Sequence, residues 1–192
     1  MISAAVQPPT DVELLGRIAS GDVGAVAALY DRHASMLLGL ALRIVRDRAE
    51  AEDVIHDAFV AVGDRAGQYV VERGAVGAWL VTLVRNLSID RTRRRDRRGA
   101  IARDVLAHDP EAKAAATPAT PEAEVASARE RERVRRALAR LPDVQRTTLE
   151  IAFYEGLTYA EIADREGVPI GTIKSRAARA LQALREALGT EE

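Results

Sequence analysis

The chain has 192 residues, a formal net charge of −1 and 47% hydrophobic residues, enough for one ordinary domain or two small ones with buried cores. Cysteine is absent, which excludes disulfides and thiolate metal sites, and the three scattered histidines (His33, His56, His108) make a poor ligand set. We therefore expect no metal and no other cofactor. Aromatic residues are scarce and alanine and leucine abundant, so we predict an all-α fold.

The N-terminus lacks the basic start and apolar core of a signal peptide. No run approaches the roughly 18 apolar residues of a membrane span. We therefore expect a cytoplasmic protein.

Four helices are predicted in the N-terminal half. Thr10 and Glu13 form a capping-box pattern that starts a short helix, and a longer one follows over about residues 22–45. Residues 48–66 place apolar side chains on one helical face, and a fourth helix begins near Gly77 after a glycine-containing loop. The inward-facing residues of the third and fourth helices are Val54, Ile55, Ala58, Phe59, Val62, Leu80, Leu83, Val84 and Leu87.

The fourth helix runs into a dense cluster of positive charge. Residues 84–98 contain seven arginines and only two aspartates, although the whole chain is almost neutral. This concentration indicates a polyanionic partner.

An Ala- and Pro-rich segment then separates two predicted domains. Residues 99–122 are typical of a flexible linker, with a frayed helix over 100–107 as the alternative. We predict one small helical domain over residues 10–98 and another over 123–192, the latter with breaks at Pro142, Gly156 and Gly167.

The second domain contains a helix-turn-helix pattern. Thr158 and Glu161 form another capping box, and Ala163, Gly167 and Ile173 have the A-x3-G-x5-I spacing. On the following helix we expect a buried stripe and a separate polar face. The buried stripe is Ile173, Ala177, Ala180, Leu181 and Leu184; the polar face is Thr172, Ser175, Arg176 and Arg179, with Lys174 beside it. This face can bind bases and phosphates in a DNA groove, and a merely solvated face is the alternative.

Three stretches resemble the extracytoplasmic-function (ECF) sigma factors of bacterial RNA polymerase. These are residues 156–185, which include GTIKSR, and residues 28–59 and 77–95. The resemblance implies a non-enzymatic subunit that binds core polymerase and promoter DNA, reads the minus-thirty-five duplex with the C-terminal helix and captures the melted minus-ten strand with the N-terminal domain. It also implies a cognate anti-sigma factor, which in this group is often membrane-anchored.

The resemblance assigns roles to two N-terminal surfaces. Glu50, Asp53 and Asp57, with Asp64 further along, share one helical face; spacing alone favours a solvated surface, whereas the family docks this helix on a basic coiled coil of polymerase. His56 within it is expected to be a packing or hydrogen-bonding residue.

On the fourth helix Trp79, Thr82, Asn86 and Arg93 lie roughly on one stripe, which by resemblance meets the melted strand, while the loop 69–76 holds a flipped base. Trp79 is equally compatible with a core position. The arginines assigned to the melted strand and the upstream phosphates are Arg91, Arg93 and Arg94.

Three other functions remain as alternatives. An autonomous helix-turn-helix regulator would leave the acidic stripe unexplained. A helical enzyme lacks support because no nucleophile–base pairing, phosphate loop or metal cluster is evident. A sigma mimic that titrates a regulator would not need Arg176 and Arg179.

Overall fold

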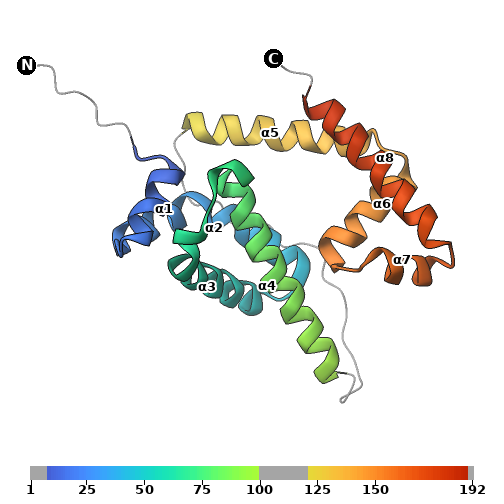
Figure 1. Cartoon of the computed structure of the whole chain (residues 1–192), viewed down its shortest axis with the longest axis horizontal. Coiled ribbons are helices and arrows are strands. Elements are labelled where there is room, and N and C mark those ends of the chain that lie inside the picture. The colour runs from blue at the N-terminus through green and yellow to red at the C-terminus, as the bar shows by residue number, and fades with distance from the viewer. Residues whose placement is uncertain (1–7, 100–120, 190–192) are drawn as a thin grey trace, which may run out of the picture. The chain divides into compact units, whose positions relative to one another are not determined.

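The computed structural model describes residues 8–99 and 121–189, which belong to two compact units, Met1–Thr117 and Pro118–Glu192. All of the regular structure in these residues is helical (Figure 1). The predicted all-α fold with two helical domains is confirmed. The expected linker lies mostly outside the described residues; of its ends, Gly99 closes one helix and Pro121 opens the next.

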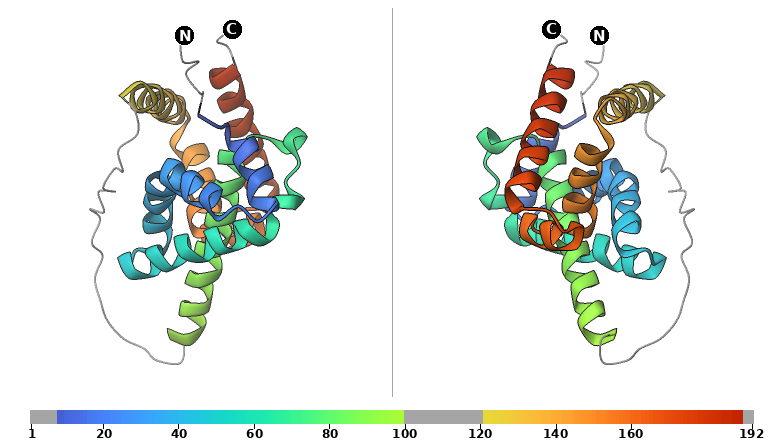
Figure 2. Two further views of the ribbon diagram at one scale, coloured as in Figure 1. Left: turned by 90° about the vertical axis from the view of Figure 1, so that its left-hand side faces the viewer. Right: turned by 90° about the vertical axis from the view of Figure 1, so that its right-hand side faces the viewer.

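Residues 8–99, the described part of the first unit, form four helices, and a connection with two short 3-10 turns joins the last two. In Figure 2 this connection stands out to one side of the helices. The helices are α1 (Asp11–Ala19), α2 (Val23–Val45), α3 (Arg48–Arg65) and α4 (Val76–Gly99), and the 3-10 turns are Ala66–Gln68 and Val71–Arg73.

Capping residues determine where the first three helices begin. Thr10 and Glu13 form the predicted reciprocal capping box, and the side chains of Asp22 and Asp47 accept backbone hydrogen bonds in the first turns of α2 and α3. Arg46 ends α2 in the left-handed conformation, with φ of 59°, directly before Asp47. The chain therefore turns from α2 into α3 within two residues.

Helix α2 packs against α1, α3 and α4, and together they enclose the core of this unit. Leu14, Leu29, Leu37 and Leu80 are fully buried, and burying such a side chain stabilises the fold by about 1.5–3 kcal/mol. The predicted inward faces of α3 and α4 are buried, with Leu87 half-buried. This packing holds the polar faces of α3 and α4 next to each other.

Within residues 121–189 the second unit has four α-helices and one π-helical segment. The breaks predicted at Pro142, Gly156 and Gly167 are confirmed, and both glycines adopt the left-handed conformation with φ of 67°. The π-helical segment was not expected from the sequence. The elements are α5 (Pro121–Ala139), α6 (Asp143–Glu150), the π-helix Ile151–Glu155, α7 (Tyr159–Glu166) and α8 (Ile170–Gly189).

One prediction for the second unit is wrong. Ile173, Ala177 and Ala180 are buried as expected, but Leu181 is 48% exposed and Leu184 is only half-buried. Each helical residue turns by about 100°, so Leu181 points away from the face that Ala180 buries. The buried stripe of α8 is therefore narrower than its sequence suggested.

Candidate nucleic-acid interface

Helices α7 and α8 form the predicted helix-turn-helix. The backbone N–H of Thr158 donates to Glu161 Oε2 across 2.6 Å, and the N–H of Glu161 donates back to Thr158 Oγ1 across 3.2 Å. After Gly167 the chain closes α7 through a hydrogen bond from Val168 N–H to the Ala163 carbonyl. Buried Ile162, Ala163 and Ile173 hold the two helices together.

The polar face of α8 contains both free and engaged side chains. Lys174 and Arg179 are exposed, and Arg179 has no partner among the residues that the structure describes. Thr172 and Ser175 are half-buried, and the Ser175 hydroxyl donates to the Thr172 carbonyl across 3.0 Å. Its oxygen can still accept a hydrogen bond.

Arg176 is held by a residue that sequence analysis missed. Its Nη1 donates to Oε2 of Glu166, the last residue of α7, across 2.6 Å, and the side chains of Arg176 and Glu166 are 22% and 26% exposed. The only signal in the sequence was an acidic residue next to the turn glycine. The pair joins α8 to α7.

The acidic residues of α3 face arginines of α4. Arg91 Nη2 donates to Asp53 Oδ2 across 2.5 Å, and its Nη1 lies 3.9 Å from Asp57 Oδ2. Arg95 Nη1 lies 3.3 Å from Glu50 Oε2 and donates to the Val45 carbonyl across 2.9 Å. The structure thus joins two residue groups to which the sequence analysis assigned different partners.

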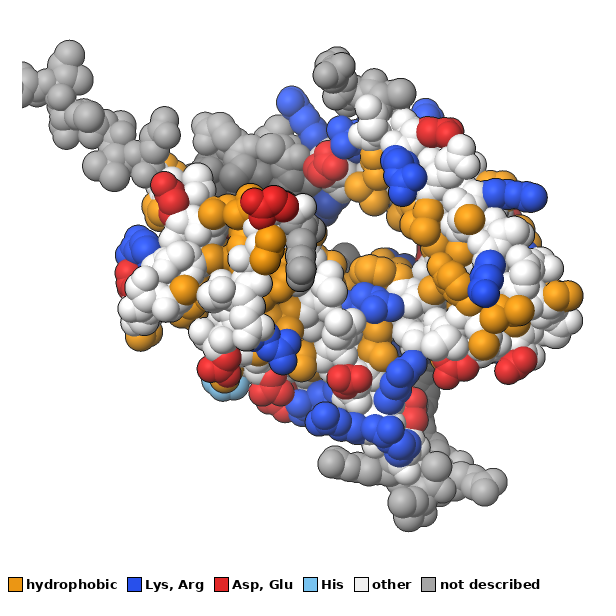
Figure 3. Space-filling model, in the orientation of Figure 1, with side chains coloured by type: hydrophobic (Ala, Val, Ile, Leu, Met, Phe, Trp, Pro, Cys, Tyr) orange, Lys and Arg blue, Asp and Glu red, His pale blue; other side chains and the backbone are white. Residues whose placement is uncertain are grey.

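The remaining arginines described at the end of α4 point outward. Arg93, Arg94 and Arg97 are exposed, and Arg94 and Arg97 have no ion-pair partner within residues 8–99 and 121–189. Figure 3 shows basic side chains gathered along the C-terminal half of α4, with acidic ones beside them. A positive surface therefore remains after Arg91 and Arg95 have paired.

At the other end of α4, Trp79 is half-buried and packs against the core. Its ring meets that of Tyr69 edge-on, with centroids 5.9 Å apart, and the Tyr69 hydroxyl donates to the Gly74 carbonyl across 2.6 Å. The two rings help to line a hollow of about 220 Å³, together with Gln68, Val70, Gly74, Ala75, Ala78 and Thr82. Trp79 is thus both a packing residue and part of a concave surface.

Asn86 is exposed on the same helix, and its Oδ1 accepts a hydrogen bond from Arg85 Nη1 across 3.2 Å. Burial, followed by repulsion from Arg93, lowers the pKa of Arg85, although a guanidinium remains charged at neutral pH. Asn86 is one turn beyond Thr82, which lines the hollow.

Both halves of the chain match known families. Residues 29–98 match Sigma-70 region 2, and residues 131–184 match Sigma-70 region 4. The ECF RNA polymerase sigma factor SigK of Mycobacterium sp. (strain KMS) is 34% identical over 186 residues, covering 94% of this chain and 92% of the relative. The chain belongs to the ECF RNA polymerase sigma factors. As a member of this family, it binds core polymerase and directs promoter-specific initiation of transcription.

A second relative agrees with this ECF sigma factor assignment. SigK of Mycolicibacterium vanbaalenii is 36% identical over 192 residues, covering 92% of this chain and 88% of the relative. Among solved structures, Rhodobacter sphaeroides SigE in complex with the anti-sigma ChrR is 30% identical, covers 92% of this chain and 97% of that chain, and has a TM-score of 0.45. The comparisons give no support to an autonomous regulator.

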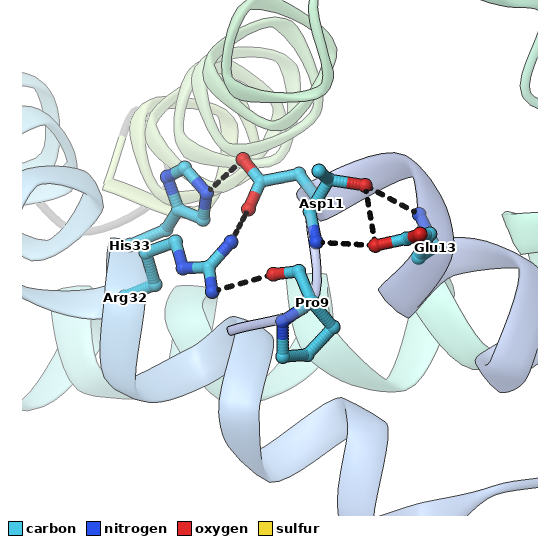
Figure 4. Close-up of polar contacts among 6 residues, drawn as sticks. Pro9, Asp11, Glu13, Arg32 and His33 are labelled. Atoms are coloured by element: carbon cyan, nitrogen blue, oxygen red, sulfur yellow. Dashed lines mark hydrogen bonds and ion pairs between the residues drawn. The ribbon is translucent and has the colours of Figure 1, made fainter. Parts of the chain in front are cut away.

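The match to region 2 begins within α2, so α1 of this sigma factor precedes it. The carboxylate of Asp11, at the start of α1, nevertheless contacts two side chains of α2 (Figure 4). It pairs with Arg32, and one of its carboxylate oxygens lies 2.8 Å from His33 Nε2. Arg32 also donates to the Pro9 carbonyl across 2.9 Å. These contacts attach α1 to the bundle.

Asp11 and Arg32 also help to line a second cavity in the sigma factor, of about 500 Å³. Tyr69 and Gly74 line both this cavity and the smaller hollow, so the loop before α4 contributes to two concave surfaces. In residues 8–99 and 121–189 no helix combines the length and apolarity of a membrane crossing, and no cluster of three or more metal-binding side chains occurs.

Proposed function

We propose that this ECF sigma factor uses three surfaces, one for core polymerase, one for the melted strand and one for duplex DNA. Residues 10–98 bind polymerase and the melted minus-ten strand, and residues 123–192 read the minus-thirty-five duplex. The observation that carries the proposal is the positive face of α8, where Lys174 and Arg179 are exposed beside Arg176 on the second helix of the turn motif.

The duplex-reading set is Thr172, Lys174, Ser175, Arg176 and Arg179. Arginine can form a bidentate contact with guanine, and Lys174 can bind a phosphate. The hydroxyls of Thr172 and Ser175 can bind either bases or phosphates.

The melted strand would lie along α4. The hollow between Tyr69 and Trp79 has aromatic and apolar walls suited to an unstacked base, and Asn86 supplies an amide one turn beyond it. Arg93 and Arg94 would follow the phosphates, and Arg91 would join them when its carboxylate partners are taken by polymerase.

Core polymerase would bind the face of α3 formed by Glu50, Asp53 and Asp57. A basic partner surface would be attracted to these carboxylates. The protein would act in the cytoplasm without catalysing a reaction itself, and family membership supports a cognate anti-sigma factor as a further partner.

Run-off transcription with core polymerase on genomic promoters tests the whole proposal. Promoter-dependent transcripts are expected only when the chain is present. Changing Asp53 and Asp57 together to arginine should abolish co-purification with core enzyme while helicity is retained, and normal assembly of this variant would refute the polymerase assignment.

A further inference from the structure

Arg91 and Asp53 belong to the two binding surfaces proposed for different partners, yet they bind each other in the free chain. Their 2.5 Å contact, with Asp57 at 3.9 Å, occupies the guanidinium that would meet DNA and the carboxylates that would meet polymerase. Neither surface is fully available while this contact persists. The two binding events are therefore linked through one set of charges.

The next arginine that is paired on α4, Arg95, makes a different set of contacts. Arg95 donates to the backbone carbonyl of Val45, at the C-terminal end of α2, as well as lying near Glu50. A cation at a helix C-terminus satisfies a carbonyl that has no intrahelical partner, so Arg95 has a structural role independent of the acidic stripe. Arg91 has only carboxylate partners among the described residues, so its contacts can be replaced without loss of a backbone hydrogen bond.

The carboxylates of this contact are accessible from outside. The side chains of Asp53 and Asp57 are 63% and 59% exposed, whereas Arg91 is 33% exposed. An incoming cation can thus approach the carboxylates while Arg91 is still bound to them. Exposed ion pairs are weak, so a partner with several positive charges can compete successfully.

We propose that polymerase binding exchanges this ion pair: basic groups of polymerase take over Asp53 and Asp57, and the released Arg91 binds a DNA phosphate. The inference rests on the proposed function of the acidic face. Because coupling between two ligands is reciprocal, DNA that binds Arg91 also exposes the carboxylates and strengthens the attachment to polymerase.

The first test releases Arg91 without polymerase. Asp53→Asn removes the closer carboxylate partner, and Asp64→Asn is the matched control, because Asp64 is also exposed on α3 and has no partner among the described residues. Both changes add one unit of positive charge. We expect the full-length Asp53→Asn chain to bind a single-stranded oligonucleotide about twofold to fivefold more tightly than the Asp64→Asn chain at low salt, as fluorescence anisotropy can measure.

The second test frees the carboxylates. Arg91→Gln should bind core polymerase about twofold to fivefold more tightly than Arg97→Gln in a competition assay, because the internal competitor is gone. Arg97 is exposed on the same helix and lies outside every proposed binding set, so its variant corrects for the change in net charge. Combining Arg91→Gln with Asp53→Asn should remove the gain in oligonucleotide binding.

These measurements separate the possible failures. Thermal unfolding of each variant identifies any that do not fold, and Arg91→Met, which also removes the charge but keeps a long aliphatic side chain, replaces Arg91→Gln if that variant is unstable. If the wild-type chain neither assembles with core polymerase nor supports run-off transcription, the proposed function is wrong. If the wild type does both, but Asp53→Asn behaves as Asp64→Asn and Arg91→Gln as Arg97→Gln, the exchange does not occur and Arg91 is only a structural clamp.

Discussion

Arg176 on α8 donates a hydrogen bond from Nη1 to the carboxylate of Glu166 on α7 across 2.6 Å. The contact leaves Nε and Nη2 of the guanidinium available for a guanine edge, since arginine has five N–H donors in one plane. Glu166 therefore restricts the orientation of the side chain that would read the base.

We predict that Glu166→Gln weakens base discrimination at the position that Arg176 would read. A bidentate arginine–guanine contact contributes about 1–3 kcal/mol of discrimination, and loss of its orientation should remove part of that. Non-specific DNA binding should rise at the same time, because one negative charge near the phosphates is lost. Transcription by holoenzyme from promoters that differ at single minus-thirty-five positions measures both effects. Unchanged preference at every position would show that Glu166 does not orient Arg176.

Arg176 and Arg179 should differ in their effect on folding. Both should lose DNA specificity alike: changing either arginine to alanine should reduce the preference of the protein for one favoured base by about 1–3 kcal/mol. Only Arg176→Ala also breaks an ion pair between α7 and α8, so it should lower the unfolding free energy by up to about 1 kcal/mol. Thermal unfolding measures the difference, and equal stabilities would mean that the pair contributes nothing. If both variants retain unaltered promoter preference, α8 is not the duplex reader.

Features that depend only on residues close together in the sequence were predictable. The capping boxes at Thr10 and Thr158 and the left-handed turn at Gly167 follow from residue type and spacing within a few positions. Which arginines of the cluster are paired and which stay exposed was not predictable, because Arg91 and Arg95 meet their carboxylate partners only when α3 lies beside α4. For the same reason the sequence could not decide whether Trp79 was a core or a surface residue.

Tyr69→Phe should loosen the loop before α4 without disturbing the core. It removes the hydroxyl that donates to the Gly74 carbonyl, a bond of 2.6 Å whose loss should cost about 0.5–1.5 kcal/mol, but it retains the ring beside Trp79. We expect slower formation of the open promoter complex, as measured by permanganate reactivity of the melted strand. Binding of the minus-thirty-five duplex should be unchanged, and open-complex formation at the wild-type rate would exclude a role for this bond.

The capping box of α1 should make the stability of this sigma factor sensitive to acid. Hydrogen bonds, first from the backbone N–H and then from the hydroxyl of Thr10, lower the pKa of Glu13 below its ordinary value of 4.5. Because the folded-state pKa is the lower one, the stabilisation is present above pH 4.5 and is lost as the pH falls through the folded-state value. The difference in unfolding free energy between the wild type and Glu13→Gln should therefore shrink below pH 4.5. A constant difference across that range would contradict the assignment.

Trp79 and Asn86 would act on the separated strand and not on the duplex. Asn86→Ala and Trp79→Ala should weaken open-complex formation while duplex binding through α8 is unchanged. Truncation of a buried tryptophan can cost about 3–5 kcal/mol, and Trp79 is half-buried against the core, so thermal unfolding must first show that the variant folds. Trp79→Phe keeps an aromatic ring and should retain most of the activity.

A promoter with a pre-melted bubble at the minus-ten element should rescue variants that fail in melting, but it should not restore base preference lost in Arg176→Ala or Arg179→Ala. If the bubble leaves the Trp79 and Asn86 variants as defective as before while they remain folded, their defect lies outside strand separation and the assignment of α4 to melting is wrong.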